Sequence, residues 1–133
     1  MKSSNDPTQP DPAALIAELQ QAGIKHTPEN IIAIAKTPDA KIVFLETGNS
    51  TSGMQHILRN HTLEFADQKI SPAEIPDAIM TAITHGEIIG YQGVKHPTPR
   101  AIYQFTFKGE TKQMAVQVSK NGYIVSANPS SYP

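Results

Sequence analysis

The last third of the chain alternates apolar and polar residues with period two, and this pattern constrains the fold more than any other. In "RAIYQFTFKG", residues 100–109, three aromatic residues alternate with smaller or polar ones, and "ETKQMAVQVS", residues 110–119, repeats the alternation. Such alternation predicts half-buried β-strands. A glycine turn and the pair Asn121-Gly122 predict hairpins between successive strands. Three consecutive antiparallel strands follow, and "EIIGYQG", residues 87–93, is expected to join them.

The first part of the chain carries two stretches with helix signals. "DPAALIAELQQAGIK" has Asp11 as a candidate N-cap, Pro12 at the first helical position and a glycine near its end. "TPENIIAIAKTP" repeats this pattern with Thr27, Pro28 and a closing Pro38. Two short helices are therefore predicted before residue 40.

The middle of the chain predicts one strand and two helices. "KIVFLE", residues 41–46, is rich in β-branched and aromatic residues and predicts a strand. A helix is expected over about residues 52–60, and another starts at Ser71, where Glu74 completes a capping-box spacing, or only at Pro76. The predicted fold class is α+β: N-terminal helices followed by a twisted antiparallel β-sheet with helices packed on one face.

Composition narrows the classes of protein to which the chain can belong. It has no cysteine, so a disulfide framework and a thiolate metal site are excluded. No apolar run approaches the length of about 18 residues that a membrane-spanning helix needs. The start, "MKSSNDPTQPDP", is polar and proline-rich, and we expect residues 1–10 to be a flexible leader within a larger protein.

Charge is distributed unevenly along the chain. Residues 1–40 have a net charge of −2 and residues 41–90 of −3, whereas residues 91–133 contain five Lys/Arg and one Asp/Glu. The basic last third permits a nucleic-acid partner without requiring one. Lysines that protect strand edges against aggregation explain it equally well.

The segment "GMQHILRNH", residues 53–61, is the first candidate site. A helical wheel, at about 100° per residue, puts His61 on the apolar stripe and both His56 and Arg59 on the opposite face. A metal site built from these two histidines alone is disfavoured, because helical ligand pairs are three or four residues apart. A solvated helix face and a histidine that caps the helix end are the simpler interpretations of these residues.

The loop "GYQGVKHPTPR" is the second candidate site. Tyr91, Lys95, His96 and Arg100 lie close together there, a composition typical of phosphate-binding clefts. Cleavage of RNA by its own 2′-OH needs a general base, a general acid and a cation for the phosphorane charge. A proline-rich hairpin loop without function is the alternative. Ser126 and Asn128, at the end of the last strand, either orient a phosphate or form a turn.

Three segments together resemble a known family. They are "KIVFLETGNSTSGMQHILRNHTLEFAD", "ISPAEIPDAIMTAITHGEIIGYQG" and "RAIYQFTFKGETKQMAVQVSKNGYIVSANP", which occur in this order over about two thirds of the chain. They resemble a C-terminal toxin domain of contact-dependent growth inhibition (CdiA-type) exoproteins. The resemblance is to the branch with the fold shared by barnase, EndoU, colicin ribonucleases and RelE toxins (BECR).

The resemblance implies a function, partners and a location. The domain is expected to be a metal-independent ribonuclease without a cofactor, with transfer RNA as substrate. The domain is expected to lie at the tip of a large cell-surface exoprotein and to act in the cytoplasm of the target bacterium, without stable insertion in a membrane. One copy of the domain is expected to form a heterodimer with a cognate immunity protein. Residues 41–133 would be the nuclease domain, and residues 11–40 a helical extension or the end of the entry region.

The resemblance also implies roles for individual residues. His56, Arg59 and His61 correspond to the family's histidine-containing helix, and the catalytic set is expected to include Arg100 and Tyr103. Substrate-binding residues are expected to be Tyr91, Lys95 and Ser126. If the helix is regular, only one of the two histidines is expected to reach the sheet.

Two other functions are alternatives. One is a non-enzymatic module of a surface exoprotein that binds RNA or protein through the basic sheet. The other is a metal-dependent DNase toxin, which is disfavoured because carboxylates and histidines do not cluster at ligand spacings in the sequence. The ribonuclease reaction expected here is attack of the 2′-OH on the adjacent phosphate, leaving a 2′,3′-cyclic phosphate and a 5′-hydroxyl.

Overall fold

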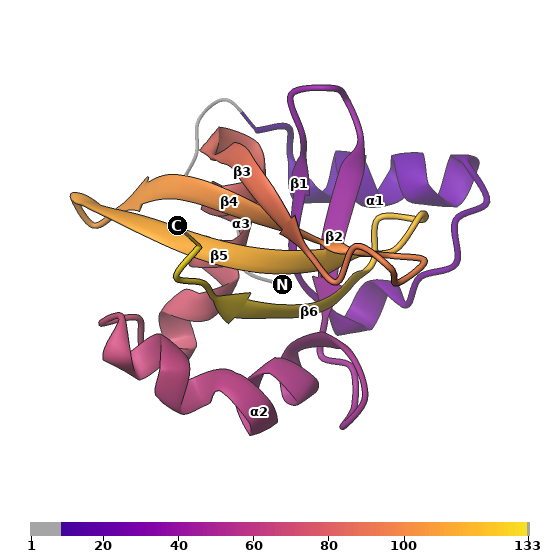
Figure 1. Cartoon of the computed structure of the whole chain (residues 1–133). Helices are drawn as coiled ribbons and strands as arrows, with labels where there is room; N and C mark the ends of the chain where they lie inside the picture. The colour runs from indigo at the N-terminus through magenta and orange to yellow at the C-terminus, as the bar shows by residue number, and fades with distance from the viewer. Residues whose placement is uncertain (1–8, 133) are drawn as a thin grey trace.

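A computed structural model describes residues 9–132 and divides them into helices, short 3-10 turns and strands (Figure 1). Along the chain the elements are α1 (Pro12–Gln21), η1 (Pro28–Asn30), β1 (Ile31–Lys36), β2 (Ile42–Glu46), α2 (Gly53–Asp67), η2 (Pro72–Glu74), α3 (Ile75–His85), β3 (Glu87–Gln92), β4 (Arg100–Phe107), β5 (Glu110–Val118) and β6 (Ile124–Pro129). The four predicted strands of the last third are all present, so the α+β class is confirmed.

The strands form two antiparallel sheets. β3, β4, β5 and β6 pair in chain order as a four-stranded meander, and β1 pairs with β2 as a separate hairpin. The two sheets meet where Phe44 of β2 forms a parallel bridge with Tyr123, just before β6. There the Phe44 amide donates a hydrogen bond of 2.9 Å to the carbonyl of Gly122. The hairpin is thereby attached to the outer side of β6.

Gly122 permits this junction because it has no side chain. Its φ is +93°, a left-handed conformation that L side chains rarely adopt. A Cβ at this position would lie 2.1 Å from the carbonyl oxygen of Ile42. The Asn121-Gly122 turn therefore serves both the β5–β6 connection and the close approach of β2.

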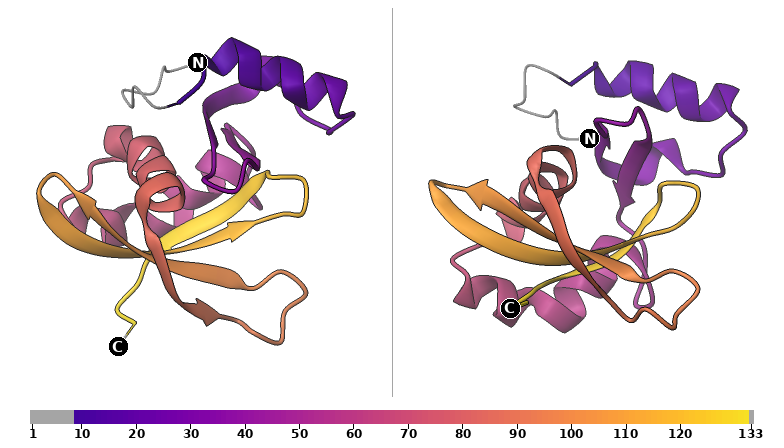
Figure 2. Two further views of the ribbon diagram at one scale, coloured as in Figure 1. Left: turned by 90° about the horizontal axis from the view of Figure 1, so that it is seen from above. Right: turned by 45° about the horizontal axis from the view of Figure 1, so that its top comes forward.

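Helices cover one face of the four-stranded sheet. α3 lies behind the sheet, between it and the β1–β2 hairpin, and α2 runs beneath β6 (Figures 1 and 2). The main core lies between these helices and the sheet, and its largest fully buried side chains include Phe65, Ile57, Ile79 and Met114. A smaller core joins α1 to the hairpin through Leu15, Leu19, Ile31, Ile34 and Phe44. The opposite face of the sheet carries no helix.

The predicted helix over residues 27–38 is wrong. Thr27 and Pro28 start only the single 3-10 turn η1, after which the chain becomes β1. Ile31 and Ile34 are β-branched and buried, and β-branched side chains favour strands. Pairing with β2 stabilises the strand, and a helix would lose this pairing. Because β2 comes later in the chain, the local sequence of residues 27–38 does not reveal it.

The predicted helix over residues 52–60 is confirmed in type but is longer than expected. α2 extends from Gly53 to Asp67, and it is regular through His61. Ser52 precedes it as N-cap residue, and the Ser52 hydroxyl lies 2.9 Å from the Tyr123 hydroxyl. This contact ties the start of α2 to the start of β6.

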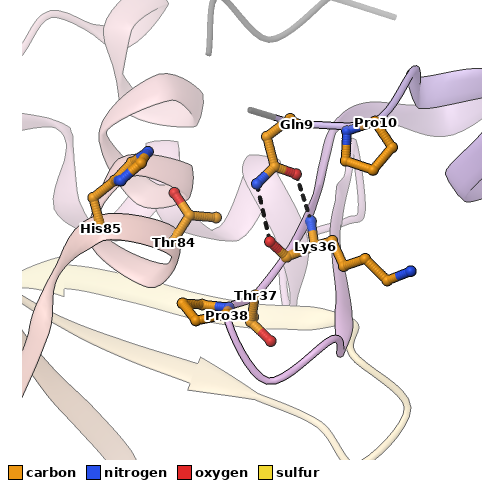
Figure 3. Close-up of a pocket in the computed structure, with 7 residues that line it drawn as sticks. All are labelled: Gln9, Pro10, Lys36, Thr37, Pro38, Thr84 and His85. Carbon is orange, nitrogen blue, oxygen red and sulfur yellow. Dashed lines mark hydrogen bonds between the residues drawn. The ribbon is translucent and has the colours of Figure 1, made fainter. Parts of the chain in front are cut away.

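The segment before α1 is attached to the edge of β1. The Gln9 carboxamide donates to the carbonyl of Lys36 at 2.9 Å and accepts from its amide at 2.7 Å (Figure 3). Of the predicted leader, residues 1–10, only Gln9 and Pro10 belong to the described residues. The expected boundary between residues 40 and 41 falls at the turn between β1 and β2.

Candidate active site

Polar side chains line one flank of α2. His56, Asn60, His61 and Glu64 follow each other along the helix at spacings that place them side by side. The imidazole rings of His56 and His61 lie edge to face, with centroids 6.2 Å apart. The helix is regular, yet the two side chains lean toward each other. The wheel had separated these residues, because it records only the direction in which each side chain leaves the helix axis.

His56 has a hydrogen-bond partner in either neutral tautomer. Its Nδ1 lies 3.1 Å from the carbonyl oxygen of Ser50, which can only accept. The same Nδ1 lies 3.0 Å from Nδ2 of Asn60, which can only donate. A protonated Nδ1 uses the first partner and an unprotonated Nδ1 the second. Such a ring can change its proton without losing its position.

His61 is oriented by a carboxylate. Its Nδ1 donates a hydrogen bond to Oε2 of Glu64, three residues later on the helix. The other nitrogen, Nε2, is then free to take up a proton from a substrate. A carboxylate in this position holds the ring in one tautomer and stabilises the imidazolium that forms.

Arg100 is the cation of the sheet that interacts electrostatically with Glu64 on this flank of α2. It lies at the start of β4, on the face that carries no helix, and its guanidinium donates to Oδ1 of Asn128 on β6. Burial lowers the pKa of Arg100 from its ordinary value, and the negative charge of Glu64 opposes this shift. The guanidinium stays charged at neutral pH because the ordinary pKa is so high. Glu64 thus bonds to the His61 imidazole and also interacts electrostatically with the Arg100 cation.

Ser126 lies on β6 near this group. Ser126 pairs with Gln117 of β5. The antiparallel pair Ala101–Val116 places Arg100 opposite Gln117 on its other side, so the three residues form a row across the sheet. Ser126 is 1% exposed, and its hydroxyl has no hydrogen-bond partner among the described residues. Buried hydroxyls normally have a partner, so an orphaned one calls for an explanation. The side chain is enclosed by protein, so a ligand has no access to this hydroxyl in this conformation.

The two tyrosines lie on the other face of the sheet. Side chains alternate along a strand, so Tyr103 and Arg100, three residues apart on β4, point to opposite faces. Tyr103 packs against the main core, and burial raises its pKa, with the neighbouring Tyr91 and Asp39 adding to the increase. The groups that act on its hydroxyl are thus Tyr91 and Asp39, and neither belongs to α2. Tyr91 is 55% exposed on the edge strand β3.

The remaining predicted site residues are exposed. Lys95 lies in the β3–β4 loop and Arg59 on α2, and neither has a hydrogen bond or ion pair within residues 9–132. Of the predicted set, the structure brings His56 and His61 together on α2 and places Arg100 and Ser126 on one face of the sheet. It leaves Lys95 and Arg59 exposed, and it places Tyr103 on the opposite face from Arg100.

The sequence analysis assigned no role to Asn60 or Glu64, and it offered Asn128 only as a residue that either orients a phosphate or forms a turn. Asn60 and Glu64 follow the two histidines at spacings of four and three residues, which bring helical side chains together. Asn128 shares a sheet face with Arg100, which the pairing of β4, β5 and β6 defines. The helical spacing of Asn60 and Glu64 can be read from the sequence, whereas the strand register that brings Asn128 to Arg100 cannot. We call His56, Asn60, His61, Glu64, Arg100, Ser126 and Asn128 the α2–β6 site.

Within residues 9–132, no three His, Asp or Glu side chains are grouped so that they could hold a metal ion. No helix of the described part is long and apolar enough to cross a membrane. Comparison of the chain with protein-family models and with curated proteins found no match.

Proposed function

We propose that the chain is an endoribonuclease toxin domain that cleaves RNA without a metal ion, by attack of a 2′-OH on the adjacent phosphate. The observation that carries the proposal is the pair of imidazoles 6.2 Å apart, one of them held by a carboxylate that also interacts electrostatically with the half-buried Arg100 guanidinium. This reaction needs a base, an acid and a cation near one phosphate. The α2–β6 site contains all three.

The hydrogen bonds suggest a role for each group. Nε2 of His61 takes the proton from the 2′-OH, and the Glu64 carboxylate stabilises the imidazolium that results. O2′ bonds to phosphorus, the bond from phosphorus to O5′ breaks, and protonated His56 gives its proton to O5′. Arg100, held by Asn128, stabilises the charge on the phosphorane oxygens. The products are a 2′,3′-cyclic phosphate and a 5′-hydroxyl.

The resemblance of the sequence to CdiA-type toxin domains supplies the biological setting of this proposal. We propose transfer RNA as substrate, a cognate immunity protein as partner and the cytoplasm of a neighbouring bacterium as the site of action. The domain would be the tip of a large cell-surface exoprotein and a monomer within a toxin–immunity heterodimer. No cofactor is needed for the chemistry proposed.

The first experiment is a digest of total bacterial RNA by the purified chain in excess EDTA. We expect discrete transfer-RNA fragments that end in cyclic phosphate. His61→Ala and His56→Ala should each lower the rate by about 10²- to 10⁴-fold, the usual contribution of a general acid or base. Glu64→Gln should lower it by less, because the imidazole remains.

A matched control is His85→Ala. His85 is at the end of α3, beside the separate cavity of 280 Å³ near Gln9 and Lys36 (Figure 3). This variant should cleave like the wild type. Cleavage that survives both α2 histidine variants would rule out the proposed acid and base. Cleavage that EDTA abolishes would favour the metal-dependent alternative, and toxicity in cells without any cleavage would favour the binding module.

A further inference from the structure

A cavity of 390 Å³ opens beside the α2–β6 site. It lies between the β3–β4 loop and the open face of the sheet, and its walls include Gln92, His96, Thr98, Arg100 and Gln117. Its volume is near the lower end of the range of about 300–1,000 Å³ that small-molecule sites occupy. Arg100 belongs both to this cavity and to the α2–β6 site. A group bound here is therefore next to the proposed scissile phosphate.

Hydrogen bonds hold the loop side of the cavity in place. The His96 amide donates to the Gly93 carbonyl at 2.9 Å, and the Thr98 amide donates to Nδ1 of His96, also at 2.9 Å. Nε2 of Gln117 donates to the Thr98 carbonyl at 3.2 Å. The cavity is therefore formed by an ordered loop turn fastened to β5.

These bonds leave a defined set of donors and acceptors in the walls. Gln117 keeps its Oε1 as an acceptor, and His96 keeps Nε2 as a donor because its Nδ1 already accepts. The Gln92 carboxamide makes no hydrogen bond within the described residues, so its donor and its acceptor are both available. No carboxylate lines the cavity.

We propose that this cavity is a binding site for one unpaired nucleobase and that it prefers adenine. The proposal rests on the ribonuclease function proposed above for the adjacent site. A glutamine carboxamide matches adenine because it accepts from the N6 amino group and donates to a ring nitrogen. We assign this bidentate contact to Gln92, which lines the cavity and keeps its carboxamide unbonded within the described residues.

The other bases fit the walls less well. Cytosine is commonly recognised by a carboxylate that accepts from N4, and the cavity has none. Guanine is commonly recognised by an arginine, but the guanidinium of Arg100 is already bonded to Asn128. Single-stranded RNA exposes its base edges for such contacts, whereas paired RNA does not. The cavity would thus select an adenosine next to the cleaved bond.

The test measures binding separately from cleavage. The full chain is titrated with the four 2′-deoxynucleoside 3′-monophosphates, which lack the 2′-OH and cannot be cleaved by the proposed route. We expect the adenine nucleotide to bind at least about fivefold more tightly than the other three, since a bidentate contact contributes about 1–3 kcal/mol of discrimination. Side-chain amide signals of Gln92 should shift in NMR spectra during the same titration.

Two variants of Gln92 sharpen the test, and a third variant is the control. Gln92→Leu should remove the preference for adenine, and Gln92→Glu should move it toward cytosine, because the new carboxylate accepts from N4. Gln92 is preferred to Gln117 for substitution because Gln117 also holds the loop. Gln21→Leu, an exposed glutamine on α1, should bind like the wild type.

The outcomes separate this inference from the proposed function. Equal binding of all four nucleotides, or an adenine preference that survives Gln92→Leu, would overturn the inference even if the chain cleaves RNA. An adenine preference lost in Gln92→Leu would support it even if no RNA is cleaved, and the ribonuclease proposal would then fail alone. In a chain that cleaves, sequenced ends should show adenosine beside the cut, with this enrichment lost in Gln92→Leu.

Discussion

At the scale of single residues, the direction of a side chain along a strand decides which groups can act together. Arg100 and Tyr103 are three positions apart on β4, so they project from opposite faces of the sheet. Arg100 donates a hydrogen bond to Asn128 and interacts electrostatically with Glu64 of α2, while Tyr103 is half-buried in the main core. The raised pKa of Tyr103 keeps its hydroxyl protonated at neutral pH. The catalytic role expected for this tyrosine therefore has no support from its position.

Substituting Arg100 and Tyr103 separately distinguishes the two faces. Arg100→Lys keeps the charge but loses the planar bidentate geometry, and we expect the rate of RNA cleavage to fall by about 10²-fold or more. Tyr103→Phe removes only a hydroxyl on the opposite face and should leave the rate close to that of the wild type. Both rates are measured on one transfer-RNA substrate. The reverse result would show that Tyr103, and not Arg100, takes part in cleavage.

At the scale of elements, β1 shows why local signals are insufficient. Thr27 and Pro28 do start a helical turn, as their types predict, but the turn is only three residues long. The sequence that follows, "IIAIAK", is an uninterrupted apolar run, and periodicity does not distinguish a buried strand from a buried helix in such a run. The partner strand β2 decides the outcome. By contrast, β3 to β6 alternate clearly and have turn residues between them, so their type and order were predictable.

The start of α3 gives a prediction about pH. Glu74 accepts from the backbone of Ser71 and pairs with Lys108, and these contacts, the backbone bond first, lower its pKa from 4.5 to about 2. A carboxylate with a depressed pKa contributes stability that is fully present above its unfolded value and is lost as pH falls toward the folded value. We therefore expect stability to decline between about pH 4.5 and pH 2.

Urea unfolding at several pH values checks this expectation. Glu74→Gln should make the decline in that window shallower than in the wild type. Lys108→Met removes one of the contacts and keeps the Ser71 bond, so its effect on the pH dependence should be intermediate. An unchanged slope in Glu74→Gln would show that the capping box does not couple to folding.

The turn before β6 gives a prediction about packing. Gly122→Ala combines a left-handed φ with a clash against the carbonyl of Ile42, whereas Gly109→Ala, at φ +78°, has open space around it. We expect Gly109→Ala to cost about 1–2 kcal/mol of unfolding free energy, the strain of that conformation. Gly122→Ala should cost more, because β2 must also move. Equal losses in urea denaturation would mean that the approach of β2 contributes little.

At the scale of the whole molecule, the two cores are joined into one body. The β1–β2 hairpin lies between the two cores. Some of its side chains pack with α1 in the small core, and others pack in the main core. Phe44 packs edge to face against Tyr123, with ring centroids 5.9 Å apart, and this contact connects the hairpin to β6. We expect residues 11–40 to fold together with the rest of the chain rather than as a separate extension.

Cooperative unfolding tests this expectation. Leu19 of α1 is fully buried, and Leu19→Ala should cost about 2–5 kcal/mol of unfolding free energy. Circular dichroism and tyrosine fluorescence should still report one coincident transition, shifted as a whole. Leu63→Ala, on α2 and 80% exposed, is the matched control and should change little. Two separate transitions in Leu19→Ala would show that α1 is a detachable unit.

The sequence by itself determined the fold class, the four-stranded meander with its turns, and the types of α1, α2 and α3. These features arise from short-range causes: alternation, capping residues and turn glycines act over a few positions of the chain. The His56 and His61 pair on α2 was also visible as a candidate, because both residues lie on one helix.

The tertiary structure alone decided that β1 is a strand and that Arg100 and Tyr103 lie on opposite faces of the sheet. It also placed Asn128 on Arg100 and left the Ser126 hydroxyl without a partner among the described residues. These outcomes depend on strand register and on contacts between residues far apart in the chain. The side-chain period of a strand is two, so a shift of one residue exchanges its faces, and only long-range packing selects one of them.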